Sequence, residues 1–147
     1  MTQRALVLLA GLGSVLLLAG AFAFQAFGYP PCTMCLWQRW PHLVAILIAG
    51  AWVIVGGRAL IWLGALAAFS TGAIGIFHTG VERDWWDGPS SCTGNGGVLQ
   101  GDLLSTDVPM LVMCDQVSWA LAGLSMASWN ALFSLIICAV WIMAARR

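Results

Sequence analysis

The sequence contains no lysine and has few charged residues of any kind. Of its 147 residues, 8% are charged, against roughly a quarter in an ordinary soluble domain. Six arginines balance six acidic residues, so the chain has no basic surface for a phosphate backbone, which argues against nucleic-acid binding. With 61% hydrophobic residues, a water-soluble monomer is excluded. At this length we expect one domain, residues 1–147.

Four long apolar segments account for most of this hydrophobicity. Roughly 20 helical residues are needed to cross about 30 Å of hydrocarbon. The predicted spans are residues 5–24, 41–57, 59–77 and 124–145. The second is the shortest, and it would span comfortably if its helix entered from Cys35. We therefore predict an all-α membrane protein, a bundle of four transmembrane helices with outer loops at residues 25–40 and 78–118.

The first apolar segment could also be a cleaved secretory signal peptide. Signal peptides have an apolar region of about 7 to 15 residues. Residues 5–24 form a longer segment, and further spans follow it. We expect this segment to remain as the first transmembrane helix.

The arginines predict the orientation of the bundle. Arg4, Arg58, Arg146 and Arg147 all fall on one side of the predicted helices. The positive-inside rule assigns that side to the cytoplasm, so both termini are expected there. The long loop 78–118, which contains all six acidic residues, then faces outward. Any chemistry on the cysteines is expected on this outward side.

Four of the five cysteines fall on the outward side. Cys32 and Cys35 form a Cys-x-x-Cys motif, and Cys92 and Cys114 lie in the long loop. In an oxidising compartment the natural pairing is Cys32 with Cys35 and Cys92 with Cys114. Closing a loop of the second pair's length could contribute about 3 kcal/mol to stability. A two-residue spacer constrains almost no chain entropy, so the first pair indicates a redox or metal motif.

The surroundings of the Cys-x-x-Cys motif favour redox chemistry. A helix that starts near Cys35 places the thiols at its N-terminus, where the helix dipole and Arg39 both favour the thiolate. Arg39 could equally be a cation that reaches the lipid headgroups. His78 ends the third span, either as a solvated or capping residue or as a donor to a ligand between helices. His42 is the weaker candidate, and Cys138 is expected to be a small packing residue.

Two further patterns concern packing and the membrane surface. Gly64, Ala68 and Gly72 form a stripe of small residues that lets a neighbouring helix approach closely. Several tryptophans gather at the outer ends of the predicted helices, as interfacial anchors do. Residues 98–113 are apolar with interruptions, and they form either a segment on the membrane surface or an ordinary loop.

Taken together, these motifs resemble the disulfide bond formation protein B (DsbB) family of bacterial inner-membrane thiol oxidases. The resemblance covers the whole chain, with four spans and two outward cysteine pairs. It rests on Pro31-Cys32-Thr33-Met34-Cys35-Leu36-Trp37-Gln38-Arg39, Phe77-His78-Thr79-Gly80, Cys114 followed by Trp119, and Gly123-Leu124-Ser125-Met126-Ala127. A lone Cys-x-x-Cys would be weak evidence, whereas this order of motifs on this topology is specific.

The resemblance implies an electron relay from a reduced periplasmic DsbA-like protein to a membrane quinone, either ubiquinone or menaquinone. Cys92 would form the mixed disulfide with the partner and Cys114 would resolve it. The reduced loop pair would then attack the inner pair, with Cys114 on Cys32 and Cys35 released as a thiolate facing the quinone. Arg39 and His78 would contact the quinone. Thiol exchange itself requires no metal.

Two alternative functions remain open from the sequence. Soft sulfur ligands could bind Cu(I) in a metal-handling membrane protein, and the candidates are Cys32, Met34, Cys35, Met110, Met113 and Cys114. An enzyme of the vitamin K epoxide reductase type would also couple cysteines to quinones. In that family the loop cysteines precede the Cys-x-x-Cys motif, whereas here they follow it.

Overall fold

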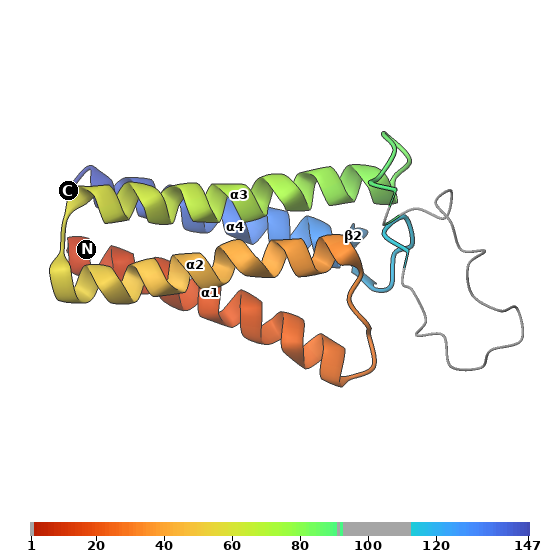
Figure 1. Cartoon of the computed structure of the whole chain (residues 1–147), viewed down its shortest axis with the longest axis horizontal. Coiled ribbons are helices and arrows are strands. Elements are labelled where there is room, and N and C mark those ends of the chain that lie inside the picture. Colours follow the sequence, from red (N-terminus) through yellow and green to blue (C-terminus); the bar gives the residue numbers. More distant parts are fainter. Residues whose placement is uncertain (1, 91, 93–112) are drawn as a thin grey trace, which may run out of the picture.

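The computed structural model describes residues 2–90, 92 and 113–147. Four helices account for most of this part of the chain (Figure 1). They are α1 (Gln3–Ala26), α2 (Thr33–Val55), α3 (Arg58–Glu82) and α4 (Met126–Ala145). A short antiparallel ladder, β1 (Ala120–Leu121) and β2 (Leu124–Ser125), precedes α4. The segment 98–113 falls almost wholly outside the described residues, so the expectation for it stays untested.

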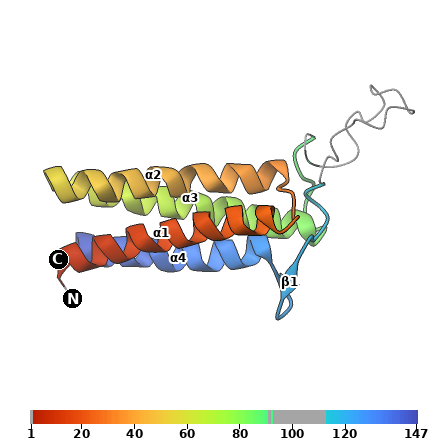
Figure 2. The same cartoon turned by 90° about the horizontal axis from the view of Figure 1, so that it is seen from below.

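The four helices lie side by side as a bundle with both chain ends at one end (Figures 1 and 2). The tight connection between α2 and α3 lies at that same end. It consists of Gly56 and Gly57, whose φ angles of 72° and 101° favour glycine. The β1–β2 hairpin lies at the opposite end. Its turn residues Ala122 and Gly123 both have positive φ, as a tight hairpin turn requires.

All four helices are long and apolar enough to cross a membrane. Large apolar side chains point away from the bundle, including Leu16, Leu66 and Ile54, whose exposed fractions are 64%, 59% and 86%. Such a surface is unsuited to water and suited to lipid tails. The chain is therefore a multi-pass membrane protein with an all-α, four-helix fold, as the sequence predicted.

A buried cluster near the chain ends packs the bundle. Trp141 of α4 is fully buried, and it packs in a cluster with Ile61, Ala65 and Ala68 of α3. A Cβ added at Gly64 would lie 2.7 Å from the Trp141 ring. Cys138 belongs to the same cluster, which agrees with a packing role. The stripe of small residues on α3 therefore lets α4 approach closely, as expected.

The second helix begins earlier than the predicted start at residue 41 and ends at Val55 rather than 57. Its N-terminus is capped by Cys32, so the Cys-x-x-Cys motif forms the first turn of α2. Pro41 lies inside the helix, which membrane helices tolerate because neighbouring groups can satisfy the freed backbone. The loop predicted for residues 25–40 is correspondingly short, since α1 continues to Ala26.

The third helix extends from Arg58 to Glu82, past the predicted end at residue 77. The last turn is held by packing, because the Trp86 indole lies against Gly80 so closely that a Cβ there would clash. Val81 in this turn is also buried. His78 is consequently inside α3, one turn before its end, and is not the first residue of the loop predicted for 78–118. The hairpin before α4 was not predicted, and it shifts the start of that helix to Met126.

Candidate functional site

Cys32 and Cys35 lie together at the N-terminus of α2. The Cys32 Sγ accepts a hydrogen bond from the Cys35 backbone N–H at 3.2 Å, which caps the helix. The two Sγ atoms are 2.9 Å apart, and both cysteines are free thiols, so the pair that the sequence analysis joined is in its reduced form. The Cys35 sulfur and burial raise the pKa of the Cys32 thiol. Cys32 therefore stays protonated, and its S–H donates a hydrogen bond to the Cys35 sulfur.

Cys92 and Cys114 form a disulfide, as the sequence predicted, with their Cα atoms 5.1 Å apart. A backbone hydrogen bond of 2.8 Å from the Cys114 N–H to the Cys92 carbonyl supports the bridge. Both cysteines are buried, with 1% and 0% exposure. The disulfide is therefore enclosed by protein in this arrangement, although both cysteines were placed in the long outer loop from the sequence.

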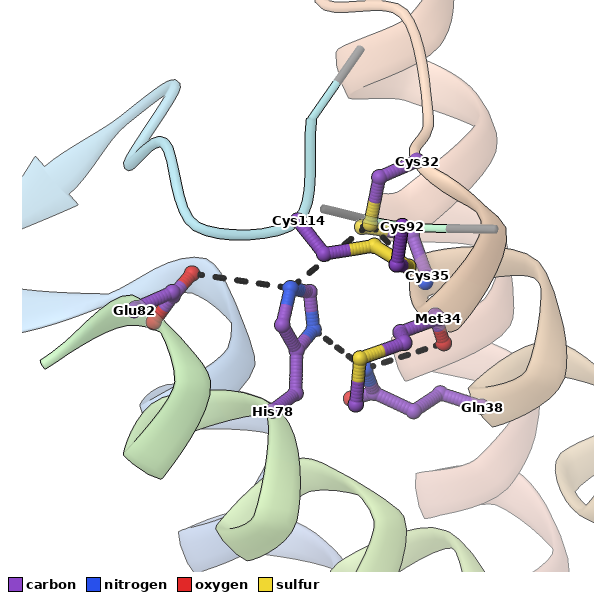
Figure 3. The surroundings of a disulfide bond; sticks show 8 residues. All are labelled: Cys32, Met34, Cys35, Gln38, His78, Glu82, Cys92 and Cys114. Atoms are coloured by element: carbon purple, nitrogen blue, oxygen red, sulfur yellow. Dashed lines mark hydrogen bonds and ion pairs between the residues drawn. A yellow bond between two sulfur atoms is a disulfide. The ribbon is translucent and has the colours of Figure 1, made fainter. Parts of the chain in front are cut away.

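The two cysteine pairs belong to one buried cluster (Figure 3). Cys32, Cys92 and Cys114 pack together with Met34 and Val81, and Cys35 borders them. Sulfurs from the start of α2 and from the segment between α3 and α4 are thus brought together, although they are far apart in sequence. This proximity is what thiol–disulfide exchange between the pairs requires, since the attacking thiolate must reach a sulfur of the other bridge.

His78 of α3 lies directly beside these sulfurs. Its Nε2 is 3.6 Å from the Cys32 Sγ and 3.9 Å from a Glu82 carboxylate oxygen, and Gln38 lies 2.9 Å from its Nδ1 (Figure 3). The Glu82 carboxylate also accepts a hydrogen bond from the Ser125 hydroxyl. From the sequence, His78 was expected to be either a solvated or capping residue or a donor to a ligand between helices. In the structure it borders both a cavity and the Cys32 sulfur.

A cavity of about 450 Å³ opens beside the cysteines, between α1, the start of α2 and α4. Apolar side chains of α1 and α4, such as Leu17, Phe24 and Phe133, form most of its wall. Cys35 and Arg39 face it from α2. A mostly apolar pocket of this size with a few polar groups is typical of small-molecule sites.

Arg39 is held at the cavity by groups of α1. Its guanidinium donates to the Gln25 side-chain oxygen at 2.8 Å and lies 4.9 Å from the centre of the Phe22 ring. Its buried Nε has no partner among the described residues. An unpaired buried donor at the wall of a cavity is a group that a ligand oxygen would satisfy.

A set of polar side chains below the cysteines was not predicted from the sequence. Gln38, Thr71 and Asn130 hydrogen-bond to one another, and His42 joins them through Asn130 at 3.0 Å. Polar residues inside membrane spans are expensive and mark functional sites by default. That rule was the available signal, since each of these residues interrupts an apolar helix.

Cys32, Cys35 and His78 could also hold a metal ion. One ligand atom from each lies within 4.8 Å of the other two. Two thiolates and an imidazole suit a thiophilic ion such as Zn²⁺ or Cu(I). Of the other sulfur ligands suggested by the sequence, Cys114 is engaged in a disulfide, and Met110 lies outside the described residues.

Comparison with known proteins gives one consistent result. The family model described as disulfide bond formation protein DsbB matches residues 3–144. The chain is 32% identical to disulfide bond formation protein B 2 of Pseudomonas aeruginosa, covering 92% of this chain and 88% of that protein. It is 30% identical to a disulfide bond formation protein B of Verminephrobacter eiseniae (92% and 82% covered) and 26% identical to one of Polaromonas sp. (98% and 91% covered). No solved structure matches the chain.

Proposed function

The chain belongs to the DsbB family of disulfide bond formation proteins, and from this membership we propose that it oxidises a periplasmic DsbA-like protein and reduces a membrane quinone. Membership itself makes the chain an oxidoreductase that acts on thiols in disulfide bond formation. The proposal adds the electron donor, the electron acceptor and the residues that connect them.

Electrons enter at the loop disulfide in this proposal. A thiolate of the partner attacks the Cys92 sulfur, so that a bond to Cys92 forms and Cys114 leaves as a thiolate. The second partner thiol then displaces Cys92, which leaves the partner oxidised and the loop pair reduced. Both loop cysteines are buried in the described arrangement, so the Cys92 sulfur has to become accessible to the partner for this step.

Internal exchange follows between the two pairs. The Cys114 thiolate attacks Cys32 of the inner disulfide and releases Cys35 as a thiolate, and Cys92 then closes the loop disulfide and releases Cys32. The observation that supports this step is the shared buried cluster of both pairs. The structure has the loop pair bonded and the inner pair reduced, which is the state expected after the exchange.

The cavity beside Cys35 fits a quinone ring. Its walls are mostly apolar, and the unpaired Nε of Arg39 provides a donor for a carbonyl oxygen. We assign Arg39 to hold the ring through this donor and His78 to line the site beside it, with Arg39 also stabilising negative charge on Cys35 and on the oxygen. When bound, a quinone supplies an acceptor for the two electrons of the inner pair and for two protons.

The orientation in the membrane is also part of the proposal. Both chain ends lie at the same end of the bundle as the connection between α2 and α3. Arg4, Arg146 and Arg147 are close to the chain ends in sequence, and Arg58 is the first residue of α3. The positive-inside rule places this end in the cytoplasm of a bacterial inner membrane. Both cysteine pairs, at the opposite end, then face the periplasm.

Thiol trapping in membranes tests this function. Membranes that contain the reduced protein are treated with ubiquinone-1 or with menadione, quenched in acid, and alkylated to count free thiols on Cys32 and Cys35. We expect both thiols to disappear on addition of quinone, and Cys35→Ser to abolish the response. Sustained oxidation of a periplasmic dithiol protein by Cys35→Ser at the normal rate would overturn the role given to Cys35.

Cys138→Ser is the matched control for this experiment. Cys138 is likewise a free cysteine, but it lies in the packing cluster at the other end of the bundle. We expect this variant to respond to quinone as the wild type does. A loss of response equal to that of Cys35→Ser would mean that the assay reports general damage to the helices.

Metal handling is the second candidate, and the triangle of Cys32, Cys35 and His78 favours it. A metal-handling protein would bind one ion per chain in its reduced form and would need no quinone. Metal analysis of the reduced protein, purified without chelators, separates the two functions. Stoichiometric Cu or Zn together with no quinone response would replace the oxidoreductase mechanism.

A further inference from the structure

The hydrogen bonds around Gln38 fix the orientation of its side-chain amide. The Gln38 NH₂ group lies 3.2 Å from the Met34 backbone carbonyl, which can only accept. The same NH₂ group lies 2.9 Å from Nδ1 of His78. Because the opposite orientation would set two oxygens against each other, the Gln38 nitrogen donates to both groups. Nδ1 of His78 is therefore an acceptor and carries no proton.

Asn130 of α4 supports this orientation from the other side. Its NH₂ group donates to the Gln38 side-chain oxygen at 2.7 Å and to the Thr71 hydroxyl at 3.2 Å. The Thr71 hydroxyl uses its own proton on the Gln38 backbone carbonyl. The remaining oxygen of Asn130 faces Nε2 of His42 at 3.0 Å, so Nε2 of that ring is the donor. Along this buried set each side chain donates a hydrogen bond to the next, in the order His42, Asn130, Gln38 and His78.

The opposite nitrogen of His78 faces acceptors. The Cys32 Sγ lies 3.6 Å from Nε2, and the Glu82 carboxylate lies 3.9 Å away. A neutral ring whose Nδ1 is an acceptor carries its single proton on Nε2, which matches these neighbours. The ring is 3% exposed, so bulk water has little access to either nitrogen.

We propose that His78 is a fixed hydrogen-bond donor to the Cys32 sulfur, not a base, and that Gln38 is the positioning residue that holds it in this tautomer. The function of this donor rests on the internal exchange proposed above. Asn130 and the Met34 carbonyl act through Gln38 by fixing its amide.

The donor acts when Cys32 is the leaving group. Cys92, as a thiolate, attacks the Cys114 sulfur of a Cys32–Cys114 bond; the Cys92–Cys114 bond forms, and the electron pair of the broken bond goes to Cys32. The Nε2–H of His78 stabilises this charge, and exchange is faster when the leaving sulfur is better stabilised. His78 neither gains nor loses a proton. The proton released by the Cys92 thiol balances the one that Cys32 finally holds.

Nitrogen NMR of the imidazole rings tests the tautomer directly. The chain has only two histidines, so the full-length protein labelled with ¹⁵N-histidine in detergent gives four ring signals. His42→Gln removes two of them and assigns the rest. We expect a protonated Nε2 and an unprotonated Nδ1 for His78, and in Gln38→Glu a protonated Nδ1, since a carboxylate can only accept. A protonated Nδ1 in the wild type would overturn the proposal.

Exchange kinetics test the role of the donor. The loop pair is reduced in quinone-free protein with an oxidised inner pair, and the reaction is quenched and alkylated at successive times. His78→Gln keeps an N–H donor but cannot act as a base in this range, and we expect a rate within about 3-fold of the wild type. His78→Leu removes the donor and should slow exchange about 10-fold or more. A general base would make both variants equally slow, and that result would refute the donor role.

The pH profile supplies a further readout. The titratable groups that face His78 are Cys32 and Cys35 from α2 and Glu82 from its own helix. The Gln38 amide and the Cys114 backbone also face the ring, and neither of them titrates. We expect wild-type exchange to follow thiol ionisation alone, and Gln38→Glu to gain a step near the ordinary imidazole value of about 6.5. Such a step in the wild type would contradict the proposal. The NMR result needs neither quinone nor partner protein, so a failure of the proposed function leaves it intact.

Discussion

Cys32 makes two different contacts with Cys35 through a single sulfur atom. It accepts the Cys35 backbone N–H at 3.2 Å and donates its own S–H to the Cys35 sulfur at 2.9 Å. The first contact caps the helix, and the second keeps the proton on the Cys32 sulfur. The two roles can be separated experimentally, because different substitutions remove them.

The proton on Cys32 leads to a prediction about pH. Because contact with Cys35 and burial raise the pKa of Cys32 above that of an ordinary thiol, Cys32 stays protonated and unreactive at pH 8. Cys35→Ser removes the sulfur contact, so the Cys32 pKa falls towards its ordinary value and the thiolate fraction at pH 8 rises. We expect several-fold faster alkylation of Cys32 by iodoacetamide in this variant, measured by peptide mass spectrometry.

No reductant is added during this measurement, so the loop disulfide is not opened by an external thiol. Cys138, buried among helices, is expected to remain unmodified in both proteins and serves as the internal reference. Equal alkylation of Cys32 in the wild type and in Cys35→Ser would show that Cys35 does not control the Cys32 proton.

The helix cap leads to a second prediction, about stability. Serine is a preferred N-cap residue, so Cys32→Ser should keep the cap, whereas Cys32→Ala should lower the free energy of unfolding by about 1 kcal/mol. Both variants lack the sulfur and should lose internal exchange to the same extent. Denaturant unfolding in detergent, followed by circular dichroism, measures the difference. If serine destabilises as much as alanine, the sulfur is not the cap.

Arg39 should affect the use of quinone at the cavity and not the loop disulfide. Arg39→Ala removes the guanidinium that lines the cavity, and we expect the KM for ubiquinone-1 to rise about 10-fold or more. Exchange between the loop pair and the partner protein should stay within about 2-fold, since neither loop cysteine lines the cavity. Arg39→Lys keeps the positive charge but lacks the planar guanidinium group, so we expect a KM between those of the wild type and Arg39→Ala.

Arg83→Ala is the control for the charge at this end of the bundle. Arg83 is exposed at the end of α3 and lies over the Trp85 ring, outside the cavity lining. Its removal should leave the quinone KM unchanged. If Arg83→Ala raises the KM as much as Arg39→Ala, the effect comes from the overall charge, and the position of Arg39 is irrelevant.

The sequence predicted the features that depend on local composition. Four apolar segments are each long enough to span a membrane, and they predict the four helices directly. The Cys-x-x-Cys motif and Arg39 lie within nine residues of one another, so their proximity could also be predicted. The bounds of α2 and α3 were wrong because contacts just outside the apolar segments set them. Gly80 extends α3 by packing against Trp86, and the Cys32 cap starts α2 before Pro41.

The polar set below the cysteines could not be predicted in this way. Gln38 and Asn130 come from opposite parts of the chain and meet only because α2, α3 and α4 pack together. No local spacing connects them, and no pattern tells which amide orientation the partners impose. The burial of the Cys92–Cys114 disulfide against Cys32 is equally a consequence of packing and not of motif.

The close approach of α3 and α4 supplies a last prediction. A Cβ at Gly64 would lie 2.7 Å from the Trp141 ring, which is fully buried and cannot shift without disturbing its cluster. Gly64→Ala should therefore lower the free energy of unfolding by about 1–3 kcal/mol.

Gly50→Ala is the matched control, because nothing lies within 4 Å of a Cβ there and alanine favours the helix. We expect it to leave the melting temperature in detergent unchanged or slightly raised. Since Gly64 is far from the cysteines, its variant should still exchange thiols below its melting temperature. A Gly64→Ala protein as stable as the wild type would mean that the two helices do not pack this closely.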